Sequence, residues 1–200
     1  MVLLTVRPTK LDRQTAGFVA DHTTSTIEQI AGTLTWAADE HVLAMLALGW
    51  WMYCRNKGAV ARRQSDHILL TTVSSAILPH IIKKFVNQER PDRLTIYGHL
   101  HGVPFSGKKY DAFPSGHALH AGALASAATI LPPAQRNSVW AVVTVLAATR
   151  VVLLAHWVSD VTAGFAMGVA VERFIRFATG YGQLRKETSL GSKRTEARSN

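Results

Sequence analysis

The sequence predicts an all-α fold, a helical bundle that crosses a membrane several times. Five apolar stretches follow one another between residues 42 and 171, and little polar sequence remains between them to cover a water-exposed surface. A membrane-spanning helix needs about 20 mostly apolar residues, and basic residues tend to gather in the cytoplasmic connections. Both patterns occur in this chain of 200 residues, so we expect one domain with five spans.

Each apolar stretch is interpreted as one span. The first ends in Trp50, Trp51 and Tyr53, aromatic residues typical of a membrane interface. The last contains Gly164 and Gly168, a spacing that allows two helices to pack closely in lipid. Any one stretch could instead be a buried helix of a soluble bundle, but the five together favour the membrane. They comprise residues 42–54, 68–82, 112–135, 138–157 and 161–171.

Basic residues predict the orientation of the spans. Arginine and lysine are abundant in residues 55–63, recur in the turn 131–137, and are abundant again after residue 171. With five spans these three segments share one side, which the positive-inside tendency makes the cytoplasm. The protein is thus predicted to be a multi-pass protein of the cell (inner) membrane, with the opposite loops on the extracytoplasmic side.

Residues 1–38 are expected to form an N-terminal region that lies in the membrane interface. Ile27, Ile30, Ala31 and Leu34 recur at helical spacing, as in an amphipathic helix. Charged residues in the same region make a span costly, although a sixth, weakly hydrophobic span is the alternative.

The remaining chain divides into a membrane domain and a tail. Residues 39–180 hold the five spans. Residues 181–200 are polar and basic and lack apolar periodicity, so we expect a disordered cytoplasmic tail.

The first cluster of candidate functional residues is Lys83, Arg90 and Pro91. Lys83 and Arg90 are seven residues apart, which is two helical turns, so both would project from one helix face. Pro91 would then end that helix. Cations at helix ends often only reach toward the interface, but this spacing favours a functional role.

The second cluster is Pro114, Ser115, Gly116 and His117, where a loop enters an apolar helix. A helix N-terminus presents free N–H groups and attracts phosphate. Ser115 can cap the helix, and Gly116 lets its backbone approach an oxyanion.

The third cluster is Arg150, His156 and Asp160. His156 and Asp160 are four residues apart and would share one helix face, so the carboxylate can orient the imidazole and leave its other nitrogen nucleophilic. Six residues do not bring Arg150 and His156 to one face, so we expect a bend between two helices there.

In their order and spacing, the three clusters resemble the signature of the type 2 phosphatidic acid phosphatase superfamily, which also includes class A acid phosphatases and vanadium haloperoxidases. The resemblance covers roughly residues 40–178. It implies that His156 attacks phosphorus and forms a phosphohistidine, that Asp160 orients it, and that His117 protonates the leaving oxygen and then activates water. It further implies a set of residues that bind the phosphoryl oxygens, namely Lys83, Arg90, Ser115, Gly116 and Arg150. Thr149 stands where the family usually has serine.

The sequence thus predicts a phosphatase that uses no metal and no cofactor. Its expected substrate is a lipid phosphate monoester or an isoprenoid diphosphate, of the phosphatidate, phosphatidylglycerophosphate, undecaprenyl diphosphate or lipid A type. Membrane lipids are its expected partners. His99 and His101 are interpreted as loop residues rather than metal ligands, and Cys54 is the only cysteine.

Two other classes of function are alternatives. A vanadium haloperoxidase would share the three clusters, although such enzymes are usually larger. A non-enzymatic protein that binds nucleic acid or anionic membranes would explain the formal charge of +9, but the sequence holds no nucleic-acid motif, so no nucleic-acid partner is expected. The sequence gives no indication of an oligomeric state.

Overall fold

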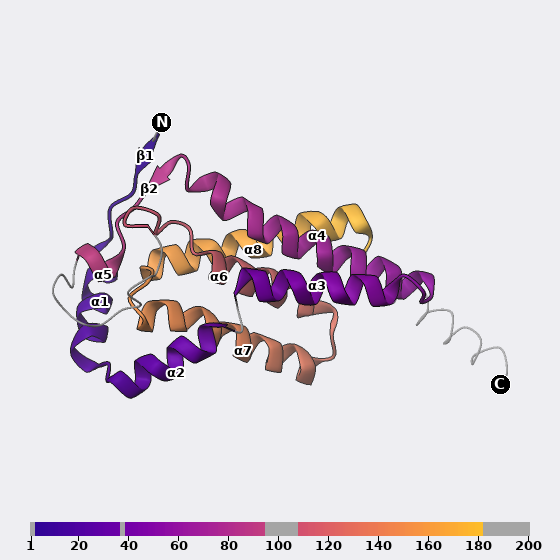
Figure 1. Ribbon diagram of the computed structural model, residues 1–200, viewed down its shortest axis with the longest axis horizontal. Coiled ribbons are helices and arrows are strands. Elements are labelled where there is room, and N and C mark those ends of the chain that lie inside the picture. Colours follow the sequence, from indigo (N-terminus) through magenta and orange to yellow (C-terminus); the bar gives the residue numbers. More distant parts are fainter. Residues whose placement is uncertain (1–2, 37–38, 95–107, 182–200) are drawn as a thin grey trace.

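The computed structural model describes residues 3–36, 39–94 and 108–181, and it is predominantly helical (Figure 1). Long helices form a bundle, and the N-terminal segments cover one end of it. The elements in chain order are β1 (Leu4–Thr5), α1 (Lys10–His22), α2 (Ser25–Thr35), α3 (Glu40–Cys54), α4 (Ala59–Ile82), β2 (Val86–Asn87), α5 (Pro91–Leu94), α6 (Gly116–Ala127), the 3-10 turn η2 (Ala128–Ile130), α7 (Pro133–Val152) and α8 (Val158–Thr179).

Helices α6 and α8 form the close-packed centre of the bundle. A Cβ atom on Gly168 would overlap the backbone of Leu119, and one on Gly122 would overlap the backbone of Phe165. Gly164 is equally restricted, because its Cβ would lie 2.5 Å from the Ser115 carbonyl oxygen. The predicted close approach at Gly164 and Gly168 is therefore confirmed, with α6 as the neighbouring helix.

The helix expected over Ile27–Leu34 is present as α2, a second short helix, α1, precedes it, and neither has the length of a sixth span. Ala16 and Ala20 of α1 pack against Leu154 and Trp157, and Ala31 of α2 packs in a second apolar cluster with Leu153 and Ala155. The apolar face of α2 remains largely exposed, because the side chains of Ile27, Ile30 and Leu34 are not covered by the rest of the bundle. Residues 3–36 therefore pack, through α1 and α2, against the connection between α7 and α8.

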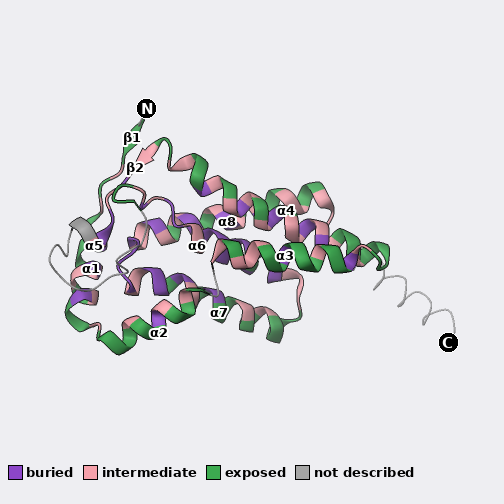
Figure 2. Cartoon of the chain, viewed as in Figure 1, coloured by how far each residue is buried: buried purple, intermediate pink, exposed green. Residues whose placement is uncertain are grey.

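Large apolar side chains cover the outside of the long helices (Figure 2 colours the exposed positions green). Examples are Met45 and Met52 on α3, Ile77 on α4, Val142 on α7 and Phe174 on α8. None of the helices among the described residues combines the length and the hydropathy required of a membrane-spanning segment. The count of five spans therefore stays a prediction, as does the tail, which lies outside the described residues apart from Tyr181.

A buried polar cluster joins α4, α6 and α8 at the end of the bundle opposite the N-terminal helices. The side chains of His67 and Glu172 are fully buried, and their Nε2 and Oε1 atoms lie 3.1 Å apart. Ser126 donates to the other carboxylate oxygen of Glu172, and Arg176 lies 2.7 Å from Oε1. The charge of Glu172 is thus paired and hydrogen-bonded, as a buried carboxylate requires.

Candidate active site

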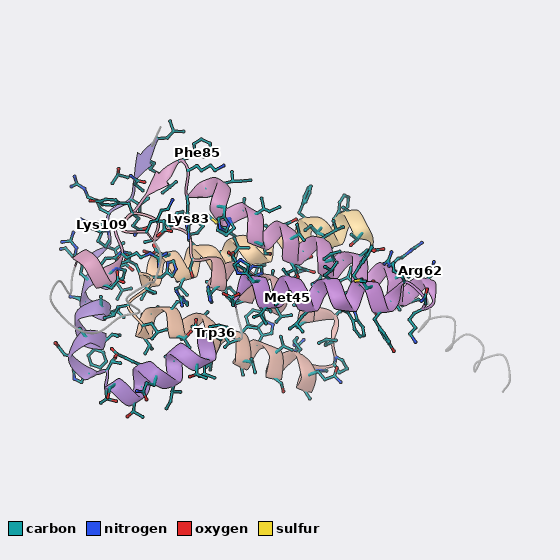
Figure 3. All side chains as sticks on the ribbon, viewed as in Figure 1. Trp36, Met45, Arg62, Lys83, Phe85 and Lys109 are labelled. Carbon is teal, nitrogen blue, oxygen red and sulfur yellow. The ribbon has the colours of Figure 1, made fainter. Side chains whose placement is uncertain are left out.

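The three sequence clusters meet at one end of the bundle, where the α7–α8 connection lies against residues 88–92 and 111–115. Lys83 and Lys109 lie at this end, and Arg62 at the opposite one (Figure 3). Four backbone or side-chain hydrogen bonds hold the connection in place: Asp92 N to Leu154 O at 3.1 Å, Trp157 Nε1 to Glu89 O at 2.7 Å, Arg90 Nη1 to Ala155 O at 2.9 Å and Ser115 N to Asp160 O at 3.3 Å. These bonds fix Leu154 in the left-handed region, with φ of 52°, a conformation that costs a residue with a side chain about 1–3 kcal/mol.

His156 lies in this connection, and its ring is buried (3% exposed). Its Nδ1 atom is 2.7 Å from the carbonyl oxygen of Ala112. A carbonyl can only accept, so Nδ1 carries the proton and Nε2 carries the lone pair. Burial lowers the pKa of His156 well below its ordinary value, and the neighbouring charges of Arg90, Arg150 and Lys83 lower it further. The ring is therefore held neutral, in the form that can act as a nucleophile.

Contrary to the prediction from the sequence, Asp160 does not hold the His156 ring by a direct hydrogen bond. Its carboxylate lies 3.7 Å from His156 Nδ1, beyond hydrogen-bond distance, because Ala112 already accepts the Nδ1 proton. The carboxylate instead accepts from the backbone N–H of Trp157 at 3.0 Å, which caps the start of α8. His156 precedes that helix, so the expectation that His156 and Asp160 share a helix face is wrong.

The expectation that Lys83 and Arg90 project from one helix is also wrong. Helix α4 ends at Ile82, and residues 86–87 form β2, which pairs in parallel with β1. Pro91 begins the short helix α5 and does not end a helix. The backbone groups of β2 therefore bond to β1, near the N-terminus, and not within a continued helix.

Arg90 reaches the site from this extended segment. Its side chain is 3% exposed, and its Nε donates to Asp111 Oδ1 at 2.9 Å. Lys83 lies at the end of α4, where burial lowers the pKa of its ammonium group; the charge of Asp111 opposes this shift and that of Arg90 adds to it. Arg90 therefore contacts Asp111 directly, whereas the charge of Lys83 interacts with both groups at longer range.

The second cluster has the geometry predicted for it. Ser115 is the N-cap of α6, and its Oγ accepts from the N–H of Ala118 at 3.4 Å. Gly116 and His117 follow in the first turn, where backbone N–H groups point out of the helix. His117 lies within electrostatic range of Arg150 and Lys83.

Arg150 lies in the last turn of α7, and α7 and α8 are separated by a bend, as predicted. Its guanidinium is mostly buried, and Nη1 donates to the hydroxyl of Thr35 at 2.9 Å. Its Nε has no hydrogen-bond partner within the part of the chain that the structure describes. The preceding Thr149 donates to the carbonyl of Leu146, so it supports the helix rather than the site.

Asp12 is the most important site residue that the sequence analysis missed. Its carboxylate is 2% exposed and accepts from both the N–H and the hydroxyl of Ser159, each at 2.9 Å, and from both donors of Thr9. Burial alone would raise the pKa of Asp12, but these hydrogen bonds outweigh it, and the pKa is lowered. Asp12 therefore joins α1 to Ser159 at the start of α8. Ser159 lies three residues after His156.

Gln88 is a second residue without a sequence signal. It is buried, and its backbone pairs with Tyr110 and Ala112. Its side-chain amide lowers the pKa of Asp160, against the rise that burial causes. No hydrogen bond of 3.5 Å or less joins the two side chains. His99 and His101 lie outside the described residues.

Comparison with known proteins agrees with this geometry. The PAP2 superfamily model matches residues 67–181. Two curated proteins, each called "Lipid A 1-phosphatase", are 38% identical over 103 residues, or 51% of this chain. They come from Rhizobium johnstonii and Rhizobium etli, and the match spans 42% and 44% of their respective lengths.

Two solved structures share the fold. LpxE of Aquifex aeolicus has a TM-score of 0.64 at 16% identity, covering 88% of this chain and 98% of that one. The transmembrane PAP2 type phosphatidylglycerolphosphate phosphatase of Bacillus subtilis has a TM-score of 0.60 at 17% identity, covering 82% of both chains. The family match covers more than half of the sequence and all three clusters, and the chain belongs to the PAP2 superfamily.

Proposed function

We propose that the protein is an integral membrane phosphatase that removes phosphate from a lipid phosphate or an isoprenoid diphosphate through a phosphohistidine. The observation that carries this proposal is the state of His156: a buried, neutral imidazole whose Nδ1 proton is committed to the Ala112 carbonyl, among three cationic side chains. The family membership and the curated relatives point to the same class of reaction.

In the first step, Nε2 of His156 attacks phosphorus and forms the N–P bond while the P–O bond to the leaving group breaks. The leaving oxygen takes a proton from the imidazolium of His117. An arriving phosphate favours that charged form, because an anion nearby raises the proton affinity of an imidazole.

In the second step, water attacks the phosphohistidine and gives its proton to His117. The N–P bond breaks, inorganic phosphate leaves, and His156 regains its lone pair. Lys83, Arg90 and Arg150 offset the negative charge on the phosphoryl oxygens in both transition states, a role that metal ions fill in many other phosphoryl-transfer enzymes.

Membrane residence is supported by the many large apolar side chains exposed on α3, α4, α7 and α8, since exposed apolar patches mark contact with lipid or a partner. The catalytic end is proposed to face the extracytoplasmic side, because Arg62, in the first turn of α4 and next to the basic α3–α4 connection, lies at the opposite end (Figure 3). Asp160 is proposed to position His156 indirectly, through the cap of α8.

The test is to trap the intermediate. Purified protein is mixed with ³²P-labelled phosphatidate, quenched, and assayed for acid-labile, base-stable label on histidine. We expect label in the wild type, none in His156→Ala, and slower turnover in His117→Ala, while His22→Ala on the exposed surface of α1 behaves like the wild type. Label on any other side chain would refute the mechanism, and halide oxidation with added vanadate in place of phosphate release would favour the haloperoxidase alternative.

A further inference from the structure

A cavity lies between α3, α4, α6 and α7, inside the bundle rather than at its catalytic end. Its volume is about 380 Å³, within the range of small-molecule binding sites. Most of its wall is hydrocarbon, contributed by residues such as Leu43, Ala47, Leu124, Val143 and Leu146. The shape and lining suit an apolar chain.

One wall of this cavity carries three buried polar side chains, Thr71 and Ser75 on α4 and His120 on α6. Among the described residues, Thr71 Oγ1, Ser75 Oγ and His120 Nε2 have no hydrogen-bond partner. Hydroxyls in helices commonly bond to the carbonyl four residues earlier, as Ser138 and Thr162 do here. A buried polar atom without a hydrogen-bond partner destabilises a protein. We call Thr71, Ser75 and His120 the polar stripe. A ligand with a hydrogen-bonding group would supply the partners that these three side chains lack.

The polar stripe begins directly beneath the phosphate site. His120 lies one helical turn after His117, and Ser75 lies one turn before Pro79, which is the nearest neighbour of Gly116 across the helix interface, 3.8 Å from the position of an added Cβ. The cavity then follows α4 from Ser75 to His67, about 12 Å at the helical rise of 1.5 Å per residue. The end of the cavity at Ser75 and His120 therefore lies within about one helical turn of the second cluster.

A second apolar groove, between α4 and α8, shows that the stripe is not a general property of the bundle surface. It is lined by side chains such as Ile77, Ile81 and Phe174. None of its described lining residues carries a buried polar atom without a partner. This groove could contact any hydrocarbon, whereas the first cavity requires hydrogen bonding as well.

We propose that the cavity binds an acyl chain of the substrate, and that the polar stripe hydrogen-bonds to the ester or amide carbonyl, or the hydroxyl, that such a chain carries near its head. This inference rests on the proposed function and narrows it. A polyprenyl chain has no polar atom to offer and would leave the stripe unpaired. Sites built to hydrogen-bond a substrate discriminate strongly against analogues that lack the bonding group, so acyl lipid phosphates are favoured over isoprenoid ones.

The test compares two phosphate monoesters in the same detergent micelles, phosphatidate and undecaprenyl phosphate. The quantity measured is the ratio of kcat/KM for phosphatidate to kcat/KM for undecaprenyl phosphate. Thr71→Val and Ser75→Ala each remove one hydroxyl, and each is expected to lower this ratio about fivefold, the effect of one lost hydrogen bond. The matched control, Thr144→Val, makes the same change on the exposed face of α7 and leaves the ratio within about twofold.

The possible outcomes separate the two proposals. If the wild type hydrolyses both lipids and the variants leave the ratio unchanged, the assignment of the cavity is refuted while the phosphatase function stands. If the wild type releases phosphate from neither lipid, nor from phosphatidylglycerophosphate, lipid A or undecaprenyl diphosphate, the proposed function itself fails.

A measurement independent of turnover uses Trp50, which lines the cavity. In His156→Ala protein, phosphatidate with brominated acyl chains should quench tryptophan fluorescence, and Trp50→Phe should remove most of that quenching. Excess unbrominated phosphatidate should reverse it, and phosphatidylcholine should not. Equal competition by phosphatidylcholine would identify the cavity as a site for bystander membrane lipid and overturn the proposal.

Discussion

Replacing Asp12 with asparagine tests whether the N-terminal helix positions the nucleophile. The asparagine oxygen can keep the bond to the Ser159 N–H at 2.9 Å, and the hydroxyls of Ser159 and Thr9 can rotate to accept from the new amide. The Thr9 N–H, now 2.9 Å from a carboxylate oxygen, cannot rotate and would face another donor. One charge-assisted hydrogen bond is thus lost from a buried site, a destabilisation of about 1.5–3 kcal/mol.

For a chain of this length that loss should lower Tm by about 3–12 °C. Because Ser159 follows His156 by three residues, kcat should fall as well, by roughly ten- to hundredfold, as expected when a catalytic group is misplaced by about 1 Å. The assays are thermal unfolding in detergent and phosphate release well below Tm. The pKa of Asp12 is lowered, so its stabilising effect is present above the unfolded value and is lost as pH falls through the folded value.

The control is Asp21→Asn, which makes the same change at an exposed position of the same helix. It should leave both Tm and kcat close to those of the wild type. If Asp12→Asn keeps Tm within about 1 °C and retains full kcat, the positioning role assigned to Asp12 is wrong.

Three further predictions concern packing, phosphate binding and pH. Gly168→Ala should destabilise the protein by about 3 kcal/mol or more because no space exists for a Cβ, whereas Gly17→Ala, with open space around it, should stabilise α1 by about 0.5–1 kcal/mol; thermal unfolding measures both, and equal effects would contradict the packing argument. Arg90→Lys keeps the charge but loses the planar fork that contacts Asp111, so kcat/KM should fall about ten- to hundredfold, and an unchanged value would exclude a geometric role for the guanidinium. The pKa of His156 is lowered and the ring must be neutral to attack, so the acid limb of the kcat/KM profile assigned to this residue should lie well below pH 6.5; a loss of activity centred above pH 6.5 would contradict that assignment.

The parts of the site that the sequence predicted well are those whose signals are local. The cap at Ser115 and the bend between Arg150 and His156 depend on short spacings, and both are confirmed. The packing of Gly164 and Gly168 is also confirmed, because small residues one turn apart have few other uses in an apolar helix.

The parts that it predicted poorly depend on distant partners. Asp12 and Ser159 are 147 residues apart, and the local pattern from Thr9 to Asp12 indicates only a helix start. The spacing of Lys83 and Arg90 fits two turns of one helix and therefore predicts a shared helix face. The parallel pairing of β2 with β1 decided otherwise, and a two-residue strand leaves no periodicity to detect. The Ala112 carbonyl that holds His156 is a backbone group, so residue types alone cannot indicate it.

The ionic cluster around Glu172 restricts how the protein can open. Sliding α4 along α8 by one turn, about 5.4 Å, would separate His67 from Glu172 and leave a buried imidazole nitrogen without its partner, so the pair favours the present register of these helices. In the proposed function, a lipid would therefore enter sideways, past side chains at the exposed mouth of the cavity such as Leu46 and Trp50. Such side chains can move while the distances among the proposed catalytic groups stay constant.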